Sequence, residues 1–217
     1  MPRTPAPRLP ARSALAGVSW RFVIQAARVT LEVNGRAATD SELRALALGG
    51  YGHFTAMQLR GGRTRGLQLH LEDSSLQQVA YQRSLAHLKH AGDFGQSYYG
   101  RLAERNGFGE ALLTGPDGLI SEGSMTNIGF FDGTAVIWPA AAMLSGITMQ
   151  LMRARLTLPQ RHSPVRVADL GSFEAVFITN SHGVAAVTQV DDRRLAVDTA
   201  FISMLKDCYE SVPWDEV

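Results

Sequence analysis

The stretch from Ile120 to Gly133 constrains this chain most, because it combines two strand patterns, one carboxylate and a tight turn. It begins as a strand, passes Glu122 at a bend of small residues, and leaves as a second apolar strand. Asp132-Gly133 then predicts a hairpin, because glycine accepts the positive φ that strand-reversing turns require. Apolar neighbours on both sides of Glu122 predict a low-dielectric site, where a carboxylate needs a cationic or hydrogen-bonding partner. A solvated glutamate at an ordinary strand end is the alternative.

Size and composition exclude several classes of function. The 217 residues suit one ordinary domain or two small ones, and an apolar content of 45% can supply a core. A net charge of +1 argues against a dominant role in binding nucleic acid or anionic membranes. Cys208 is the only cysteine, which suits a reducing compartment, and no apolar run reaches the length of a membrane span. We therefore expect a cytoplasmic protein without a nucleic-acid or membrane partner.

The first third of the chain has the pattern of a leader followed by a small α/β unit. Residues 1–28 carry five arginines, several prolines and no acid, which indicates a disordered leader, a start site placed too far upstream or, more loosely, an organelle transit segment. Alternation over 29–33 predicts a strand, and Asn34-Gly35 predicts a hairpin after it. Thr39 and Glu42 form a candidate capping box. The other expected elements are a helix over 40–48, strands over 51–59 and 64–69, and partial helix over 72–86.

Helices and strands alternate in the rest of the chain. Asn106-Gly107 ends a predicted helix over 94–105, whose apolar face is formed by Phe94, Tyr98 and Leu102. A final predicted helix covers 198–209, with an inner stripe of Phe201, Met204, Leu205 and Cys208. Between them we expect strands over 111–114, 176–179 and 184–190, the Glu122 hairpin ending with a strand over 136–139, and a helix over 145–156.

Lysine is scarce, which narrows the search for a reactive amine. Of the 21 basic residues only Lys89 and Lys206 are lysines, which leaves 19 arginines. Lys206 is expected to point outward from the final helix. Lys89 lies just before a helix, where partial desolvation would lower the pKa of its amine and make it a nucleophile or proton carrier; an ordinary exposed lysine is the competing interpretation. A lysine, the acid Glu122 and a helix N-terminus at 145–148 are the three parts that a pyridoxal phosphate site needs.

Four motifs in order resemble the class IV aminotransferases, the fold-type IV pyridoxal-phosphate enzymes. That family includes branched-chain aminotransferases, D-amino-acid transaminases and aminodeoxychorismate lyases. The matching stretches are Leu88-Lys89, Gly118 to Phe131 with its Ser-Glu-Gly-x-x-x-Asn core, Gly146-Ile147-Thr148, and Phe177 to Ser181. A looser match covers 31–71 through Tyr51-Gly52 and His70-Leu71.

The resemblance implies an α+β fold, with a shortened small α/β domain over 29–86 and a larger β-rich pseudo-barrel domain with flanking helices over 87–217. It implies pyridoxal 5'-phosphate as the cofactor, an amino acid and a keto acid as substrates, and a homodimer. Lys89 would be the Schiff-base lysine and proton shuttle, and Glu122 would pair with the ring nitrogen. The other implied contacts are Gly146, Ile147 and Thr148 for the phosphate, Asn127 as a brace or a direct contact, and Tyr51, Ser181 and His182 for substrate, with Ser181 also available to phosphate.

Three departures from the family pattern bear on function. Glu72-Asp73 stands where the family places a phosphate-clamping arginine after His70-Leu71, and Phe94 stands where a tyrosine often follows the lysine. Several dozen residues of the family's small domain are also absent before Lys89. Aminodeoxychorismate-lyase-like activity and a catalytically degenerate homologue kept for binding or assembly therefore stay open. A metal site at His70, His87 and His90 lacks a completing carboxylate or thiol, and we expect no metal.

Overall fold

The computed structural model describes residues 20–25, 28–33, 36–43, 59–60, 63–64, 73–90, 92–213 and 215–216. The chain divides into two compact units, Met1–Gly52 and His53–Val217. The sequence instead predicts boundaries after residues 28 and 86. The second boundary differs because residues 74–80 form a strand within the main sheet of the second unit.

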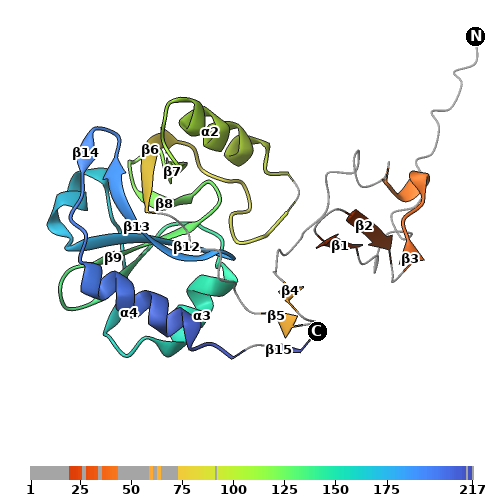
Figure 1. Ribbon diagram of the computed structural model, residues 1–217. Coiled ribbons are helices and arrows are strands. Elements are labelled where there is room, and N and C mark those ends of the chain that lie inside the picture. Colours follow the sequence, from red (N-terminus) through yellow and green to blue (C-terminus); the bar gives the residue numbers. More distant parts are fainter. Residues whose placement is uncertain are drawn as a thin grey trace, which may run out of the picture. The chain divides into compact units, whose positions relative to one another are not determined.

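The N-terminal unit contains a three-stranded antiparallel sheet, formed by β1 (Trp20–Gln25), β2 (Arg28–Val33) and β3 (Arg36–Ala37) (Figure 1). β1 pairs with β2 along its whole length, so residues 20–25 are a strand rather than part of a leader; their aromatic and β-branched side chains favour that conformation. Val33 pairs antiparallel with Arg36, as the predicted hairpin requires, while Asn34 and Gly35 themselves lie outside the described residues. Residues 40–43 are helical, and the Thr39 N–H donates to Glu42 Oε2 at 2.9 Å, which confirms the capping box.

The second unit holds a small antiparallel sheet and a large mixed sheet. In the small sheet β5 (Arg63–Thr64) lies between β4 (Leu59–Arg60) and β15 (Asp215–Glu216). The large sheet has the order β11-β10-β9-β12-β13-β6-β7-β8, with β14 (Arg193–Arg194) paired to β13. Its other strands are β6 (Ser74–Ala80), β7 (Glu110–Thr114), β8 (Ile120–Gly123), β9 (Asn127–Phe131), β10 (Val136–Pro139), β11 (Gln160–Ser163), β12 (Ala175–Asn180) and β13 (Gly183–Val190).

β6 corrects the expectation of partial helix over 72–86. It runs parallel to both β13 and β7, with Leu76 opposite Val190 on one side and Glu110 on the other. Leu76 is fully buried, whereas the four remaining residues of Ser74–Gln78 are only partly buried or exposed. Few apolar side chains therefore mark this strand locally, and its place in the sheet depends on partners distant in sequence.

The large sheet curls, which brings β8 at its end back beside β9. Apolar side chains from seven strands fill the inside of the curl, together with Val165 and with Leu170 of the 3-10 helix η2 (Val167–Ser172). This mixed α+β architecture with a curled half-barrel sheet agrees with the fold expected from the sequence.

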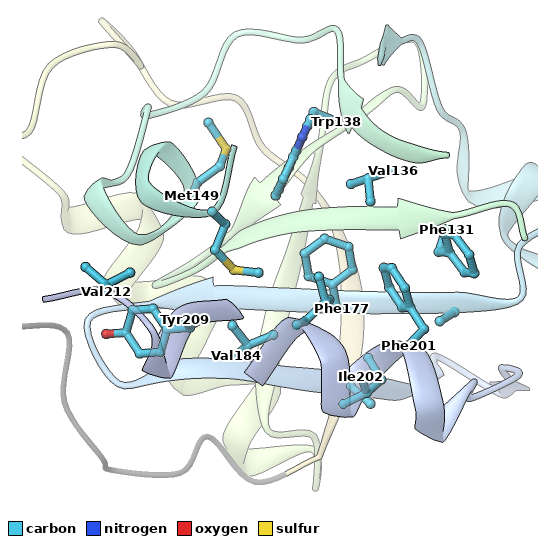
Figure 2. Close-up of a cluster of buried hydrophobic side chains, with 14 residues drawn as sticks. Phe131, Val136, Trp138, Met149, Phe177, Val184, Phe201, Ile202, Tyr209 and Val212 are labelled. Carbon is cyan, nitrogen blue, oxygen red and sulfur yellow. The ribbon is translucent and has the colours of Figure 1, made fainter. Parts of the chain in front are cut away.

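Two helices cover the outer face of β12 and β13, as Figure 1 shows: α3 (Ile147–Arg155) and α4 (Thr199–Glu210). Their apolar side chains pack against Phe131, Trp138 and Phe177 in the cluster drawn in Figure 2. The rings of Phe131 and Phe201 stack with centroids 4.0 Å apart. The buried residues of α4 are Phe201, Ile202, Leu205 and Tyr209, so Met204 and Cys208 are only partly buried, and Lys206 has intermediate exposure.

The helix α2 (Phe94–Arg105) has the predicted bounds but buries a different face. Gln96 and Ala103 are buried, while Phe94 is 81% exposed and Tyr98 is 53% exposed. A Cβ atom on Gly95 would lie 2.3 Å from the Tyr81 ring. The helix thus approaches the sheet closely on its glycine- and alanine-bearing side, and the aromatic stripe lies outside.

Across the part of the chain that the structure describes, every helix is too short or too polar to cross a membrane.

Candidate functional site

Glu122 is placed by a bulge in β8. Leu113 of β7 lies opposite Glu122, and the next residue, Thr114, lies opposite Ile120, so Ser121 is an extra residue on β8. Because cross-strand partners share a face, Glu122 lies on the side of Leu113, which packs against α2, whereas Ile120 belongs to the core inside the curl. The bulge thus turns the carboxylate away from the apolar interior.

The Glu122 carboxylate is buried and incompletely paired. Its side chain is 4% exposed, Oε2 accepts a hydrogen bond from the Leu144 N–H at 3.1 Å, and Oε1 has no hydrogen-bond partner among the described residues. Burial raises the pKa of Glu122 to about 7, against the opposing effects of the Leu144 hydrogen bond and the charges of Arg83 and Lys89. A buried acceptor without a donor favours binding of a ligand that brings one.

Asn127 connects Glu122 to the start of α3. The Asn127 Nδ2 donates to the Leu144 carbonyl at 2.6 Å, and its Oδ1 accepts from the Gly146 N–H at 3.1 Å. Leu144 is therefore held by Glu122 at its N–H and by Asn127 at its carbonyl. Gly146 is the N-cap of α3, and the unpaired N–H groups of the helix's first turn follow it. The hydrogen bonds of Asn127 therefore reach the N-cap of α3 as well as the residue that donates to Glu122.

The start of α3 is also tied to the turn after β12. The Thr148 hydroxyl is buried and donates to the Asn180 carbonyl at 2.7 Å, so its proton is committed within the protein. The His182 N–H donates to Asn180 Oδ1 at 2.7 Å, which closes the turn. Ser181 is half-buried in that turn and the His182 side chain is exposed.

Lys89 lies within electrostatic reach of Glu122. It is half-buried in the segment between β6 and α2. Desolvation lowers the pKa of the Lys89 amine, the Arg83 charge lowers it further, and the charges of Asp93 and Glu122 oppose this. Tyr51, His70, Leu71 and Glu72 lie outside the described residues.

Sequence reasoning missed two charged residues of this region. Arg83 is buried and its Nη1 lies 3.7 Å from Glu122 Oε1. Glu110 is buried at the start of β7, where it accepts hydrogen bonds from the Ser124 hydroxyl at 3.3 Å, the Thr126 hydroxyl at 2.9 Å and the Met125 N–H. Burial raises the pKa of Glu110 despite these bonds. The available signal was a charged residue directly before the apolar run Ala111–Leu113, the position that Glu110 occupies.

Two cavities are formed by described residues of the second unit. One of about 320 Å³ is lined by residues that include Gln96, Glu110 and Asn180, and one of about 380 Å³ is lined by residues that include Arg153 and His162. Neither is lined by Lys89 or Glu122. Within the described ranges no three His, Cys, Asp or Glu side chains are grouped as metal ligands would be.

A curled half-barrel carrying a buried acid, a nearby lysine and a braced helix N-terminus defines a protein of the fold-type IV class. The profile of the family described as amino-transferase class IV matches residues 56–190. That match covers more than half of the chain, and the chain belongs to the class IV aminotransferase family.

Solved structures show the same fold. A fold IV-transaminase from Curtobacterium pusillum is 20% identical with a TM-score of 0.59, over 65% of this chain and 54% of its own. A putative 4-amino-4-deoxychorismate lyase from Legionella pneumophila is 20% identical with a TM-score of 0.59, over 65% and 57%. A hypothetical aminotransferase from Mycobacterium tuberculosis, in a PLP-bound form, is 21% identical with a TM-score of 0.57, over 64% and 54%. The chain thus spans about half the length of these proteins, and the comparison with curated proteins finds no match.

The family depends on pyridoxal phosphate, and the residues present fit that group. Glu122 Oε1 is a buried acceptor to which no described residue donates, which suits a protonated ring nitrogen. The first turn of α3 offers backbone N–H groups to a phosphate. Lys89 supplies an amine whose pKa is lowered by burial.

Proposed function

We propose that this chain is a pyridoxal-phosphate-dependent aminotransferase that acts on an amino acid and a keto acid through Lys89. The observation that carries the proposal is the buried Glu122 carboxylate, which accepts a hydrogen bond from the Leu144 N–H before α3 and interacts electrostatically with Lys89. When bound, the cofactor supplies an electron sink for the carbanion formed on the substrate.

Lys89 is proposed as the covalent attachment point and the proton carrier. Its lowered pKa leaves more of the amine unprotonated near neutral pH, so that it can attack an aldehyde and accept a proton from substrate. Asp93 and Glu122 hold a proton on Lys89 more firmly, and the amine can therefore also return one.

Glu122 is proposed as the partner of the ring nitrogen. In the ligand-free chain its pKa of about 7 leaves the carboxyl partly protonated at neutral pH. A cationic N–H placed against Oε1 would favour the ionised carboxylate and lower that pKa. The acid would thereby keep the ring nitrogen protonated.

The phosphate is proposed to bind at the start of α3, at the backbone N–H groups of Ile147 and Thr148. Asn127, whose Oδ1 accepts from the Gly146 N–H, is proposed to hold Gly146 for this purpose. Because the Thr148 hydroxyl proton is donated to Asn180, its hydroxyl would need to turn to donate to phosphate. Ser181 and His182 are proposed to face the substrate. We also propose that the chain forms a homodimer. A cytoplasmic location is proposed because a single cysteine, Cys208, suits a reducing compartment.

The test is the absorbance spectrum of the purified chain, with and without added pyridoxal 5'-phosphate. We expect a visible band from the lysine-bound cofactor in the unaltered chain and in Lys206→Ala, and its loss in Lys89→Ala. Equal spectra for the two lysine variants, or no band at all, would refute the assignment.

A donor screen then separates the remaining alternatives. Amino transfer to a keto acid supports the aminotransferase, and pyruvate release from aminodeoxychorismate supports the lyase that the Legionella pneumophila structure suggests. A band without turnover on either panel would indicate the degenerate homologue, which the Glu72-Asp73 replacement and the shortened N-terminal part favour.

A further inference from the structure

Arg83 is the least expected charged side chain near Lys89. Its side chain is 5% exposed, and a buried guanidinium is costly unless other groups neutralise it and accept its hydrogen bonds. The residue follows β6 and precedes Lys89 by six positions. Its burial therefore requires partners that neutralise the charge and accept its hydrogen bonds.

The guanidinium has two different partners and one unused donor. Nη2 donates to the Leu88 carbonyl, which belongs to the peptide unit directly before Lys89. Nη1 faces Glu122 Oε1 at 3.7 Å, and Nε–H has no acceptor among the described residues. Arg83 thus contacts both the segment that carries the amine and the acid.

We propose that Arg83 is a positioning residue of this site, which ties the peptide before Lys89 to the Glu122 carboxylate. A planar guanidinium can make both contacts at once because its N–H groups are held in a rigid fork. Two contacts within residues 84–90 also hold the segment before Lys89. The Leu88 N–H donates to the Leu85 carbonyl at 2.8 Å, and His90 Nε2 lies 3.0 Å from the Ser84 carbonyl. Those bonds are internal to the segment, whereas Arg83 connects it to β8.

The tie has an electrostatic consequence for the amine. Among the described residues, the charges of Arg83, Asp93 and Glu122 act on Lys89, and of these three Arg83 opposes protonation. Removing the guanidinium leaves the two acids without this opposing charge, which raises the pKa of Lys89. Arg83 therefore keeps more of the amine available at neutral pH.

The test measures the ligand-free chain, so it does not depend on whether the proposed cofactor binds. Competitive acetylation across a pH series gives the pH midpoint of Lys89, with Lys206 as the reference lysine in the same sample. We expect Arg83→Met to raise the midpoint, so that Lys89 modification at pH 8 falls by about threefold to tenfold, since one pH unit changes the reactive fraction tenfold. Arg194→Met, at an exposed residue, should leave the midpoint unchanged.

Arg83→Lys separates the effect of the charge from that of the two contacts. A lysine ammonium keeps the positive charge but lacks the planar guanidinium that contacts Leu88 and Glu122 together. We expect its midpoint to stay nearer that of the unaltered chain, while amide hydrogen exchange over 84–90 speeds up in both Arg83 variants. An unchanged midpoint and unchanged exchange in folded Arg83→Met would overturn the proposal.

Glu122→Gln provides the reciprocal test if Arg83→Met does not fold. Losing the acid should lower the Lys89 midpoint and speed exchange over 84–90, because Arg83 then lacks its charged partner. Neither change appearing would equally overturn the tie.

Discussion

The raised pKa of Glu122 makes a quantitative prediction about stability. The pKa rises from its ordinary value of 4.5 to about 7 in the folded chain, so the folded state binds this proton more tightly than the unfolded state. The contribution to the unfolding free energy is therefore fully present below about pH 4.5 and is lost as pH rises through about 7. At about 1.4 kcal/mol per pH unit the total is about 3 kcal/mol, most of it lost between about pH 5 and pH 8.

Glu122→Gln removes this titration while keeping the shape and the acceptor for the Leu144 N–H. The assay is urea unfolding of the ligand-free chains from pH 5 to pH 8, with linear extrapolation to water. The unaltered chain should lose about 2–3 kcal/mol relative to Glu122→Gln across that range. Groups common to both chains, including Glu110, cancel to first order in this difference. Glu104→Gln, at an exposed position on α2, is the matched control and should follow the unaltered chain.

If the difference in unfolding free energy between the two chains stays constant with pH, Glu122 is ionised like an exposed glutamate. Burial would then not raise its pKa. Saturating pyridoxal 5'-phosphate supplies a second arm. If a ring N–H pairs with Glu122, the folded-state pKa falls, and the loss of stability with rising pH should shrink or reverse in the loaded protein.

Three other substitutions test separate parts of the structure. Gly146→Ala would place a Cβ 2.2 Å from Asn127 Oδ1, so affinity for pyridoxal 5'-phosphate should fall more than affinity for pyridoxal, and equal losses would contradict a phosphate at α3. Glu110→Ala leaves the Met125 N–H and two hydroxyls without their acceptor and should cost about 2–4 kcal/mol in urea unfolding at pH 7; a cost below about 0.5 kcal/mol would count against that hydrogen-bond cluster. Phe201→Ala removes a ring stacked in the core and should cost about 3–5 kcal/mol, whereas Ser203→Ala on the exposed face should cost little.

Local signals in the sequence identified many elements correctly. α2 has its predicted bounds because Asn106-Gly107 ends it, and Gly107 has a φ of 87°. The turn at Asp132-Gly133 is also present, with Gly133 at a φ of 90°. Such signals are reliable because a turn or cap is decided by neighbouring residues.

Apolar spacing predicts the wrong buried face for α2, because the side of this helix that packs carries small and polar residues. The glycines at 95 and 100 allow close approach to Tyr81 and Ser124, and a search for apolar periodicity does not register a glycine. β6 was missed for a related reason: its neighbours are β7 and β13, and the pairing with β13 joins residues more than 100 positions apart.

By itself the sequence determined the family, the order of most elements and the chemical types at the site, because turn chemistry, periodicity and four motifs are local properties of the chain. Only the tertiary structure decided that a bulge at Ser121 turns Glu122 toward α2, that Asn127 links it to α3, and that Arg83 lies against it. These features depend on burial and on contacts between distant segments, and neither is written in any single stretch of residues.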